Sequence, residues 1–295
     1  MNNSVGIISM QFARPFTRQH LPLFAHMKSL GFDLVELLVP EPEDDLDLAA
    51  TRAAIETAGL TVALAARVNP SRSVCDADPA IRKAGLDYLK YALAVADALG
   101  ARFLGGPLYG APMVFAGRAP APVAEDEMRA RGERTIEAMA ALAPLAQNIG
   151  CKLALEPLNR YETDVISTVS QALSVIDAVD HPAFGLLFDT FHANIEEGSI
   201  PDAIRMAGNR IVYFQANENH RGFPGTGHID WAETMRALSA VGYDGPLTLE
   251  PFRRNDDRIG LPIAQWRAPH EDESEKLKHA VALIRAMAYM AEYRR

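Results

Sequence analysis

Cysteine is scarce in this chain, and the patterns that usually give it a role are missing. Only two cysteines occur among 295 residues, Cys75 and Cys151, and they stand far apart without a metal-binding spacing. We expect both to be plain thiols in a reducing compartment. The sequence therefore predicts neither a disulfide framework nor a cysteine-based metal site.

Long apolar runs and basic stripes are also absent. No uninterrupted apolar stretch reaches the roughly 18 residues of a membrane span, and the N-terminus lacks the basic-then-apolar pattern of a signal peptide. The formal net charge is −9, and lysine and arginine are scattered without a stripe that could follow a phosphate backbone. We therefore expect a cytoplasmic protein with neither a membrane nor a nucleic-acid partner.

Short apolar runs alternate with segments of helical periodicity, which is typical of βα units around a parallel sheet. We predict strands near residues 4–10, 33–38, 60–66, 102–106, 151–156, 184–189, 210–215 and 246–250. The predicted helices cover roughly 18–30, 46–58, 79–99, 124–149, 167–180, 199–208, 230–241 and 272–292. Asp230 and either Thr168 or Ser167 stand where N-caps belong, and glycines at 31, 59, 100, 150 and 242 stand where helices should end.

Eight such units without a linker or a change in composition predict one (β/α)₈ TIM barrel, an α/β fold, as a single domain over residues 1–295. A doubly wound open sheet is the alternative. It fits poorly because Ser-Met-Gln-Phe-Ala-Arg (9–14) stands where a glycine-rich phosphate loop would follow the first strand. The loops at 107–122 and 251–271 follow strands, so we expect them to rim the face that holds the active site and to cover a substrate.

Four oxygen-bearing side chains each end an expected strand. They follow Leu-Ala-Leu, Gly-Leu-Leu-Phe, Ile-Val-Tyr-Phe and Leu-Thr-Leu, and are Glu156, Asp189, Gln215 and Glu250. Their spacings of 33, 26 and 35 residues each match about one strand plus one helix. A parallel barrel carries its active site at the carboxyl ends of its strands. We therefore expect the four to converge there as oxygen ligands of a divalent cation such as Mn²⁺ or Mg²⁺.

Two further polar residues follow these strands. His192 lies three residues beyond Asp189, and Arg221 lies in the polar loop 217–221 after the seventh strand. Taken alone, they would be an ordinary loop histidine and part of a solvated turn. On the same rim as a metal, they would contact a substrate's oxygens.

Four motifs together resemble those of the ketose 3-epimerases, which include D-tagatose and D-allulose 3-epimerases and lie in the xylose-isomerase-like TIM-barrel superfamily. The motifs are Leu-Glu-Pro-Leu-Asn-Arg-Tyr-Glu (155–162), Asp-Thr-Phe-His-Ala-Asn-Ile-Glu-Glu (189–197), Pro-Gly-Thr-Gly-His-Ile-Asp-Trp (224–231) and Gly-Tyr-Asp-Gly-Pro-Leu-Thr-Leu-Glu-Pro-Phe (242–252). The likeness covers nearly the whole chain, including Gly-Phe-Asp-Leu-Val-Glu (31–36) in the second strand. Four motifs in the right order are far more specific than any one of them.

The resemblance implies an isomerase that inverts carbon 3 of a free ketose by removing and returning a proton through a cis-enediolate. By this resemblance Glu156 and Glu250 match the acid/base pair, and together with Asp189 they match three of the four metal ligands. Glu162, His192 and Arg221 match positions that hold the substrate's oxygens. The expected cofactor is a divalent ion, Mn²⁺ first, with Mg²⁺ or Co²⁺ as alternatives. The expected partners are a small sugar and further copies of the chain, as a homodimer or homotetramer.

The chain departs from the family pattern at two places. Gln215 stands where the ketose epimerases usually carry a histidine, although an amide oxygen can also ligate, as in the related hydroxypyruvate isomerases. The first strand, Gly-Ile-Ile-Ser-Met-Gln (6–11), lacks the aromatic residues that the epimerases place around the sugar. A hydroxypyruvate isomerase, or another aldose–ketose isomerase using the same metal site, is therefore the main alternative. An inosose dehydratase and a non-catalytic sugar-binding protein are further alternatives. An endonuclease IV-type enzyme would need more histidine ligands at strand ends.

Overall fold

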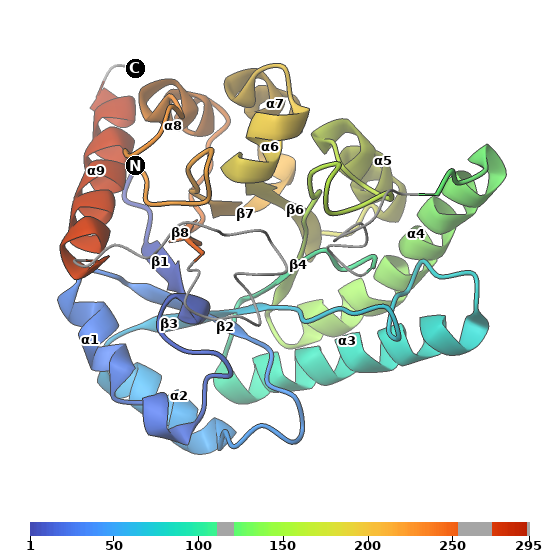
Figure 1. Ribbon diagram of the computed structural model, residues 1–295, viewed down its shortest axis with the longest axis horizontal. Coiled ribbons are helices and arrows are strands. Elements are labelled where there is room, and N and C mark those ends of the chain that lie inside the picture. The colour runs from blue at the N-terminus through green and yellow to red at the C-terminus, as the bar shows by residue number, and fades with distance from the viewer. Residues whose placement is uncertain (111–120, 253–272, 294–295) are drawn as a thin grey trace.

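Eight parallel strands close into a barrel in which each strand pairs with its sequence neighbours and β1 pairs with β8. The computed structural model describes residues 1–110, 121–252 and 273–293, and Figure 1 shows the strands at the centre of a ring of helices. The strands are β1 (Val5–Ile8), β2 (Leu34–Leu38), β3 (Thr61–Ala65), β4 (Phe103–Gly106), β5 (Lys152–Leu155), β6 (Phe184–Asp189), β7 (Ile211–Gln215) and β8 (Leu247–Leu249). The predicted (β/α)₈ barrel is thus confirmed, with every strand inside or near its expected range.

The helices also follow the prediction, with one addition. They are α1 (Leu23–Ser29), α2 (Leu48–Thr57), α3 (Pro79–Leu99), α4 (Glu125–Asn148), α5 (Val169–Val179), α6 (Thr190–Glu196), α7 (Ile200–Ala207), α8 (Trp231–Ala240) and α9 (Glu273–Tyr293). The short helix α6 was not predicted. It begins immediately after β6 because the Asp189 carboxylate caps its first turn by accepting the N–H of Phe191, at 2.7 Å.

The expected helix boundaries are confirmed where the structure describes them. Asp230 caps α8 by accepting the N–H of Glu233, and Thr168 caps α5 in a reciprocal capping box with Gln171. All five predicted glycines have positive φ, and Gly100 closes the long helix α3 in the left-handed conformation that costs glycine least. Most of the two predicted covering loops, at 111–120 and 253–271, lies outside the described residues.

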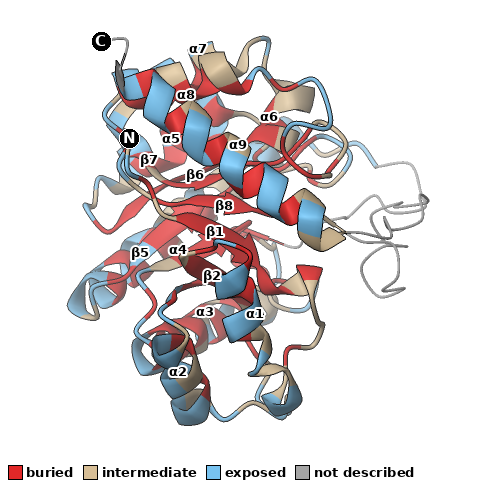
Figure 2. Ribbon diagram, turned by 90° about the vertical axis from the view of Figure 1, so that its left-hand side faces the viewer, coloured by how far each residue is buried: buried red, intermediate tan, exposed pale blue. Residues whose placement is uncertain are grey.

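A layer of apolar side chains fills the inside of the barrel. Inward side chains of five strands form a separate buried cluster, distinct from the larger core between strands and helices: Leu34, Ala63, Ala154, Leu187 and Tyr213. Figure 2 shows the strands almost wholly buried, while the helices expose their outer faces. Because strand side chains alternate between faces, a residue two positions further along each strand also faces inward, one layer nearer the carboxyl ends.

None of the described helices combines the length and apolar character needed to cross a lipid bilayer. The helices instead cover the outside of the barrel, so that the described apolar surface lies mainly between helix and strand. The remaining polar inward positions gather at the carboxyl ends of the strands, where the candidate site lies.

Candidate active site

The four strand-end residues lie in the polar layer directly above the apolar cluster. Glu156 follows Ala154 by two positions, Asp189 follows Leu187 and Gln215 follows Tyr213, so all three face inward. The register pairs Asp189 with Gln215, which places their side chains on neighbouring strands at one level. Glu250 immediately follows β8, and each of the four is at most 7% exposed.

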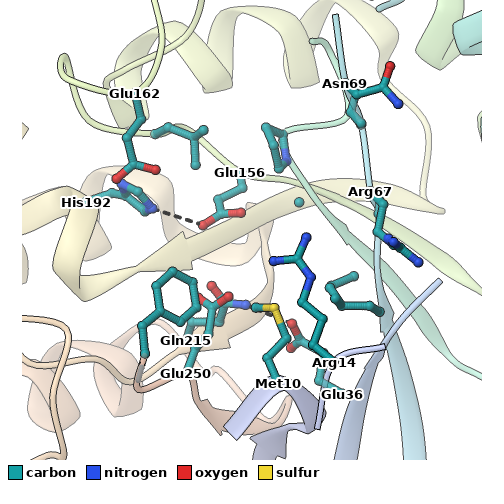
Figure 3. A pocket seen from close by; sticks show the side chains of 18 of the residues that line it. Met10, Arg14, Glu36, Arg67, Asn69, Glu156, Glu162, His192, Gln215 and Glu250 are labelled. Carbon is teal, nitrogen blue, oxygen red and sulfur yellow. Dashed lines mark hydrogen bonds and ion pairs between the residues drawn. The ribbon is translucent and has the colours of Figure 1, made fainter. Parts of the chain in front are cut away.

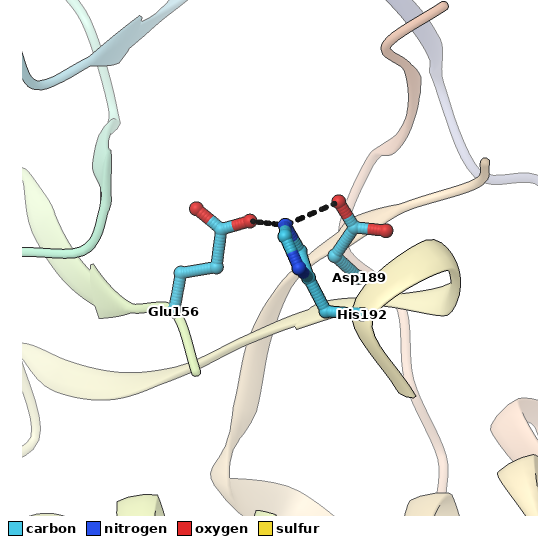
Figure 4. Close-up of side chains that lie close together, drawn as sticks. All are labelled: Glu156, Asp189 and His192. Carbon is cyan, nitrogen blue, oxygen red and sulfur yellow. Dashed lines mark ion pairs between the residues drawn. The ribbon is translucent and has the colours of Figure 1, made fainter. Parts of the chain in front are cut away.

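Glu156 and Asp189 converge with His192 on one small volume (Figure 4). One ligand atom from each residue lies within 4.8 Å of the others. His192 Nε2 lies 3.5 Å from Glu156 Oε1 and 3.8 Å from Asp189 Oδ2. These three side chains alone could hold a cation if the histidine nitrogen were free to ligate.

The hydrogen bonds of His192 give its ring a different role. Its Nδ1 accepts the backbone N–H of Asn159 at 3.0 Å, so that nitrogen carries no proton. Burial lowers the pKa of His192, against the opposing effect of Asp189, which favours the neutral ring. A neutral imidazole then carries its proton on Nε2, which is buried and has no hydrogen-bond partner among the described residues. His192 therefore presents a hydrogen-bond donor to the site and not a metal-ligating lone pair.

Gln215 supplies an oxygen where His192 does not. Its Nε2 donates to Glu36 Oε1 at 3.0 Å, whereas its Oε1 is buried without a hydrogen-bond partner in the described structure. A buried amide oxygen left without a donor is costly unless something else satisfies it. The unsatisfied Gln215 Oε1 is thus an available cation ligand.

Arg221 reaches into the site from the loop after β7. Its Nη1 donates to Asp189 Oδ2, and its Nη2 lies 3.1 Å from Glu250 Oε2, close enough for an ion pair but not in hydrogen-bonding geometry. The guanidinium stands between the rings of Phe191 and Phe252, 4.6 and 4.4 Å from their centroids. Its backbone adopts φ of 60°, which is rare outside glycine, so the loop holds Arg221 in a specific place.

Asn217 ties the ends of three strands together. It lies just beyond β7, and its Nδ2 donates to Asp189 Oδ2 at 3.0 Å. Its Oδ1 accepts the backbone N–H of Glu250 at 2.8 Å. Because Asn217 is fully buried, these bonds fix the Asp189 carboxylate relative to the end of β8.

Burial concentrates negative charge in this layer and shifts its titration. It raises the pKa of Glu156 well above 4.5, and the charges of Glu250 and Asp189 raise it further. It raises the pKa of Glu250 to about 8, against the opposing charge of Arg221. It raises the pKa of Glu36 to about 7, partly offset by hydrogen bonds from Tyr213 and Gln215. Carboxylates crowded in a dry site become stable as anions when a cation joins them.

The donor set fits a hard divalent cation. Three carboxylates and one amide offer oxygen atoms only, and such sets suit Mg²⁺ and Mn²⁺ better than softer metals. Within the described part of the chain Gln215 Oε1 and Glu250 Oε2 are buried and accept no hydrogen bond, although Glu250 Oε2 lies in ion-pair range of Arg221. The structure thus brings the four oxygen-bearing residues expected from the sequence into one buried layer, with His192 beside them as a donor.

A cavity of about 300 Å³ opens above these residues (Figure 3). Glu162 lines one side, where its Oε1 accepts a hydrogen bond from Asn159 Nδ2 at 2.8 Å. Met10 and Arg14 enter from the segment after β1. Arg67 lines the opposite wall and is paired with Asp44 at 2.8 Å. Glu162, His192 and Arg221 thus border one space.

Several residues of the site were missed from the sequence, and Glu36, Asn159 and Asn217 are the ones that contact the expected site residues. Glu36 interrupts the apolar run of β2, and its inward position could have been found from the period of two that begins at Leu34. Asn159 and Asn217 lie in loops, and only the fold shows that Asn159 contacts His192 and Asn217 contacts Asp189. Loop residues have no periodicity from which such contacts could be predicted.

Comparison with known proteins gives consistent matches along most of the chain. The model of a family described as xylose isomerase-like TIM barrel matches residues 24–287. An L-ribulose 3-epimerase of Mesorhizobium japonicum is 33% identical over 286 residues, which cover 95% of this chain and 92% of that protein. A ketose 3-epimerase of Arthrobacter globiformis is 32% identical over 260 residues, which cover 88% of this chain and 87% of that protein. A solved structure of L-ribulose 3-epimerase matches with a TM-score of 0.90 and 32% identity, covering 99% of this chain and 96% of that one.

Proposed function

The chain belongs to the xylose isomerase-like TIM-barrel family, and within it to the isomerase-class ketose 3-epimerases, and we propose that it inverts carbon 3 of a free ketose with the help of a divalent cation. The observation that carries this proposal is the buried layer of Glu156, Asp189, Gln215 and Glu250, in which two ligand-competent oxygens have no hydrogen-bond donor among the described residues. The relatives' activities support the reaction class, and the donor set supports the metal dependence.

The proposed metal ligands are Glu156, Asp189, Gln215 and Glu250, and the proposed ion is Mn²⁺, with Mg²⁺ or Co²⁺ as alternatives. A divalent cation at this position supplies Lewis-acid stabilisation of the negative charge that develops on the substrate's carbonyl oxygen. The chain's own residues then have to remove a proton, return one and hold the sugar in place.

Glu156 and Glu250 are the proposed acid/base pair. One carboxylate takes the proton from carbon 3, which leaves an enediolate over carbons 2 and 3, and the other carboxyl group donates a proton to the opposite face of carbon 3. They directly follow β5 and β8, two strands that are not neighbours in the barrel. In the metal-free site burial raises the pKa of both carboxyl groups, and a bound cation would oppose that shift and favour the anion that accepts a proton.

The substrate's oxygens are the proposed partners of Glu162, His192 and Arg221. The neutral His192 offers its Nε2–H, which lacks a hydrogen-bond acceptor in the described structure. Glu162 is held by Asn159 and offers its remaining acceptor capacity to a hydroxyl group. In this proposal Glu162 and His192 anchor the hydroxyl at carbon 1, and Arg221 holds a more distant oxygen.

The test is proton–deuterium exchange followed by NMR, using Mn²⁺-loaded protein in D₂O. Free ketoses from tetruloses to hexuloses are tested beside hydroxypyruvate. We expect deuterium at carbon 3 and appearance of the epimer with at least one ketose. Exchange only at carbon 1, or only with hydroxypyruvate, would instead support the isomerase alternative that Gln215 favours.

The matched variants are Glu156→Gln and Glu250→Gln, which keep shape and an oxygen atom but cannot accept the substrate's proton. We expect both to lose epimerisation while circular dichroism shows an intact fold. Appreciable turnover by either variant would contradict the assignment of the acid/base pair.

A further inference from the structure

Gln215 is the one proposed ligand whose useful atom depends on the orientation of its end group. A carboxylate presents oxygen whichever way it turns, whereas a flipped amide presents an NH₂ group that repels a cation. Nothing in the chemistry of glutamine itself prevents that flip. The site therefore needs a neighbour that distinguishes the amide nitrogen from the amide oxygen.

Glu36 is that neighbour. It lies on β2, two positions after Leu34, so it faces inward in the same layer as the proposed ligands. Its Oε1 accepts Gln215 Nε2–H at 3.0 Å, and its Oε2 accepts the Tyr213 hydroxyl at 2.6 Å. The Tyr213 oxygen also lies 2.7 Å from Thr248 Oγ1, which further fixes the position of Glu36.

The geometry determines the orientation of the amide. A carboxylate that accepts two hydrogen bonds has no proton to offer to an amide oxygen, so the Gln215 NH₂ must face Glu36. Gln215 Oε1 then faces away from Glu36, and it is buried without a donor among the described residues. Glu36 itself is only 2% exposed, so water does not replace this contact easily.

We propose that Glu36 is a positioning residue that orients the Gln215 amide, so that its oxygen, and not its nitrogen, faces the cation. The inference rests on the proposed metal-dependent function. It adds the contact that lets a neutral glutamine present its oxygen as the fourth oxygen ligand. The ion that this set selects is a hard divalent cation, because no nitrogen or sulfur ligand is presented. In this role Glu36 acts on the cation through Gln215, and it also lines the cavity.

The first experiment measures the dissociation constant of Mn²⁺ from the change in the electron paramagnetic resonance signal of the free ion. Wild type is compared with Glu36→Gln, whose own NH₂ can donate to Gln215 Oε1 and so turn the amide round. We expect the variant to bind Mn²⁺ about 10- to 100-fold more weakly, as is usual when the partner of a ligating residue is lost. Unchanged affinity in a folded variant would overturn the inference.

A double-mutant cycle isolates orientation from other effects. Gln215→Glu replaces the amide by a group with two equivalent oxygens, for which orientation no longer matters. In that background Glu36→Gln should no longer weaken Mn²⁺ binding. An equal loss of affinity in both backgrounds would show that Glu36 acts by some other route and would refute the proposal.

Two further variants serve as controls. Glu36→Asp keeps the charge but withdraws the acceptor from Gln215 by one methylene, so it should also weaken Mn²⁺ binding; it gives a second test if Glu36→Gln fails to fold. Tyr213→Phe removes the other hydrogen bond to Glu36 and leaves the Gln215 contact, so its effect should be much smaller. If wild type itself fails to bind Mn²⁺, the proposed function fails as well. Tight binding by wild type and Glu36→Gln alike overturns the positioning role alone.

Discussion

Removing the metal and raising the pH should destabilise this protein, because buried carboxyl groups at the site resist ionisation. Burial raises the pKa of Glu36 to about 7 and that of Glu250 to about 8 from an ordinary value of 4.5. A carboxyl group whose pKa is higher in the folded chain binds more protons there than in the unfolded chain. Its stabilising contribution is complete below about pH 4.5 and is lost as the pH rises through the folded pKa.

The size of the effect follows from those two pKa values. Each pH unit over which a group is protonated in the folded chain and ionised in the unfolded chain costs about 1.4 kcal/mol. Below pH 6.5, His192 acts in the opposite direction, since burial lowers its pKa. Between pH 6.5 and 8, Glu250 and Glu36 together should reduce the free energy of unfolding by about 2 to 3 kcal/mol. Glu250 contributes most of this change because its pKa is the higher.

The assay is urea unfolding at 25 °C in the presence of a chelator, followed by circular dichroism across that pH range. A parallel series with saturating Mn²⁺ should show stabilisation by the metal that increases with pH, since binding requires ionised carboxylates. The matched variant Glu250→Gln should show a smaller pH dependence in the metal-free protein, because it removes the group whose pKa is about 8 and a charge that raises the pKa of Glu156. Stability that is flat or rises from pH 6.5 to 8 without metal would refute this account of the site.

Two further predictions concern the barrel itself. Leu187→Ala removes a large side chain from the apolar cluster inside the barrel. It should lower the free energy of unfolding, measured in urea, by about 2 to 5 kcal/mol. A loss under about 1 kcal/mol would mean that this cluster is not tightly packed. Thr168→Ala removes the N-cap of α5 and should lower the free energy of unfolding by about 1 kcal/mol. Turnover should stay unchanged, because α5 contributes no residue to the cavity lining. A loss of turnover in a folded variant would contradict the view that α5 has a structural role alone.

Helix and strand positions could be predicted because they depend on local pattern. The period of two and the period of 3.6 persist over several residues, and caps such as Asp230 and Thr168 mark where helices begin. The one helix missed, α6, begins with Asp189 as its cap. The sequence predicts Asp189 as a strand end and a ligand. The same carboxylate also starts a helix, because its Oδ1 accepts the N–H of Phe191 while its Oδ2 accepts Asn217 Nδ2–H on the side of the site.

The sequence by itself determined the eight-unit architecture and the polar residues that end the fifth to eighth strands, because chain order and alternation need no knowledge of distant contacts. Only the tertiary structure decided the roles within that layer. Closure of the barrel brings Glu36 of β2 to Gln215 of β7, 179 positions away in the chain, and thereby orients the amide. Folding likewise places the Asn159 N–H on His192 Nδ1 and makes that ring a donor. Which group donates and which accepts depends on tertiary contacts, and no local sequence pattern predicts those contacts.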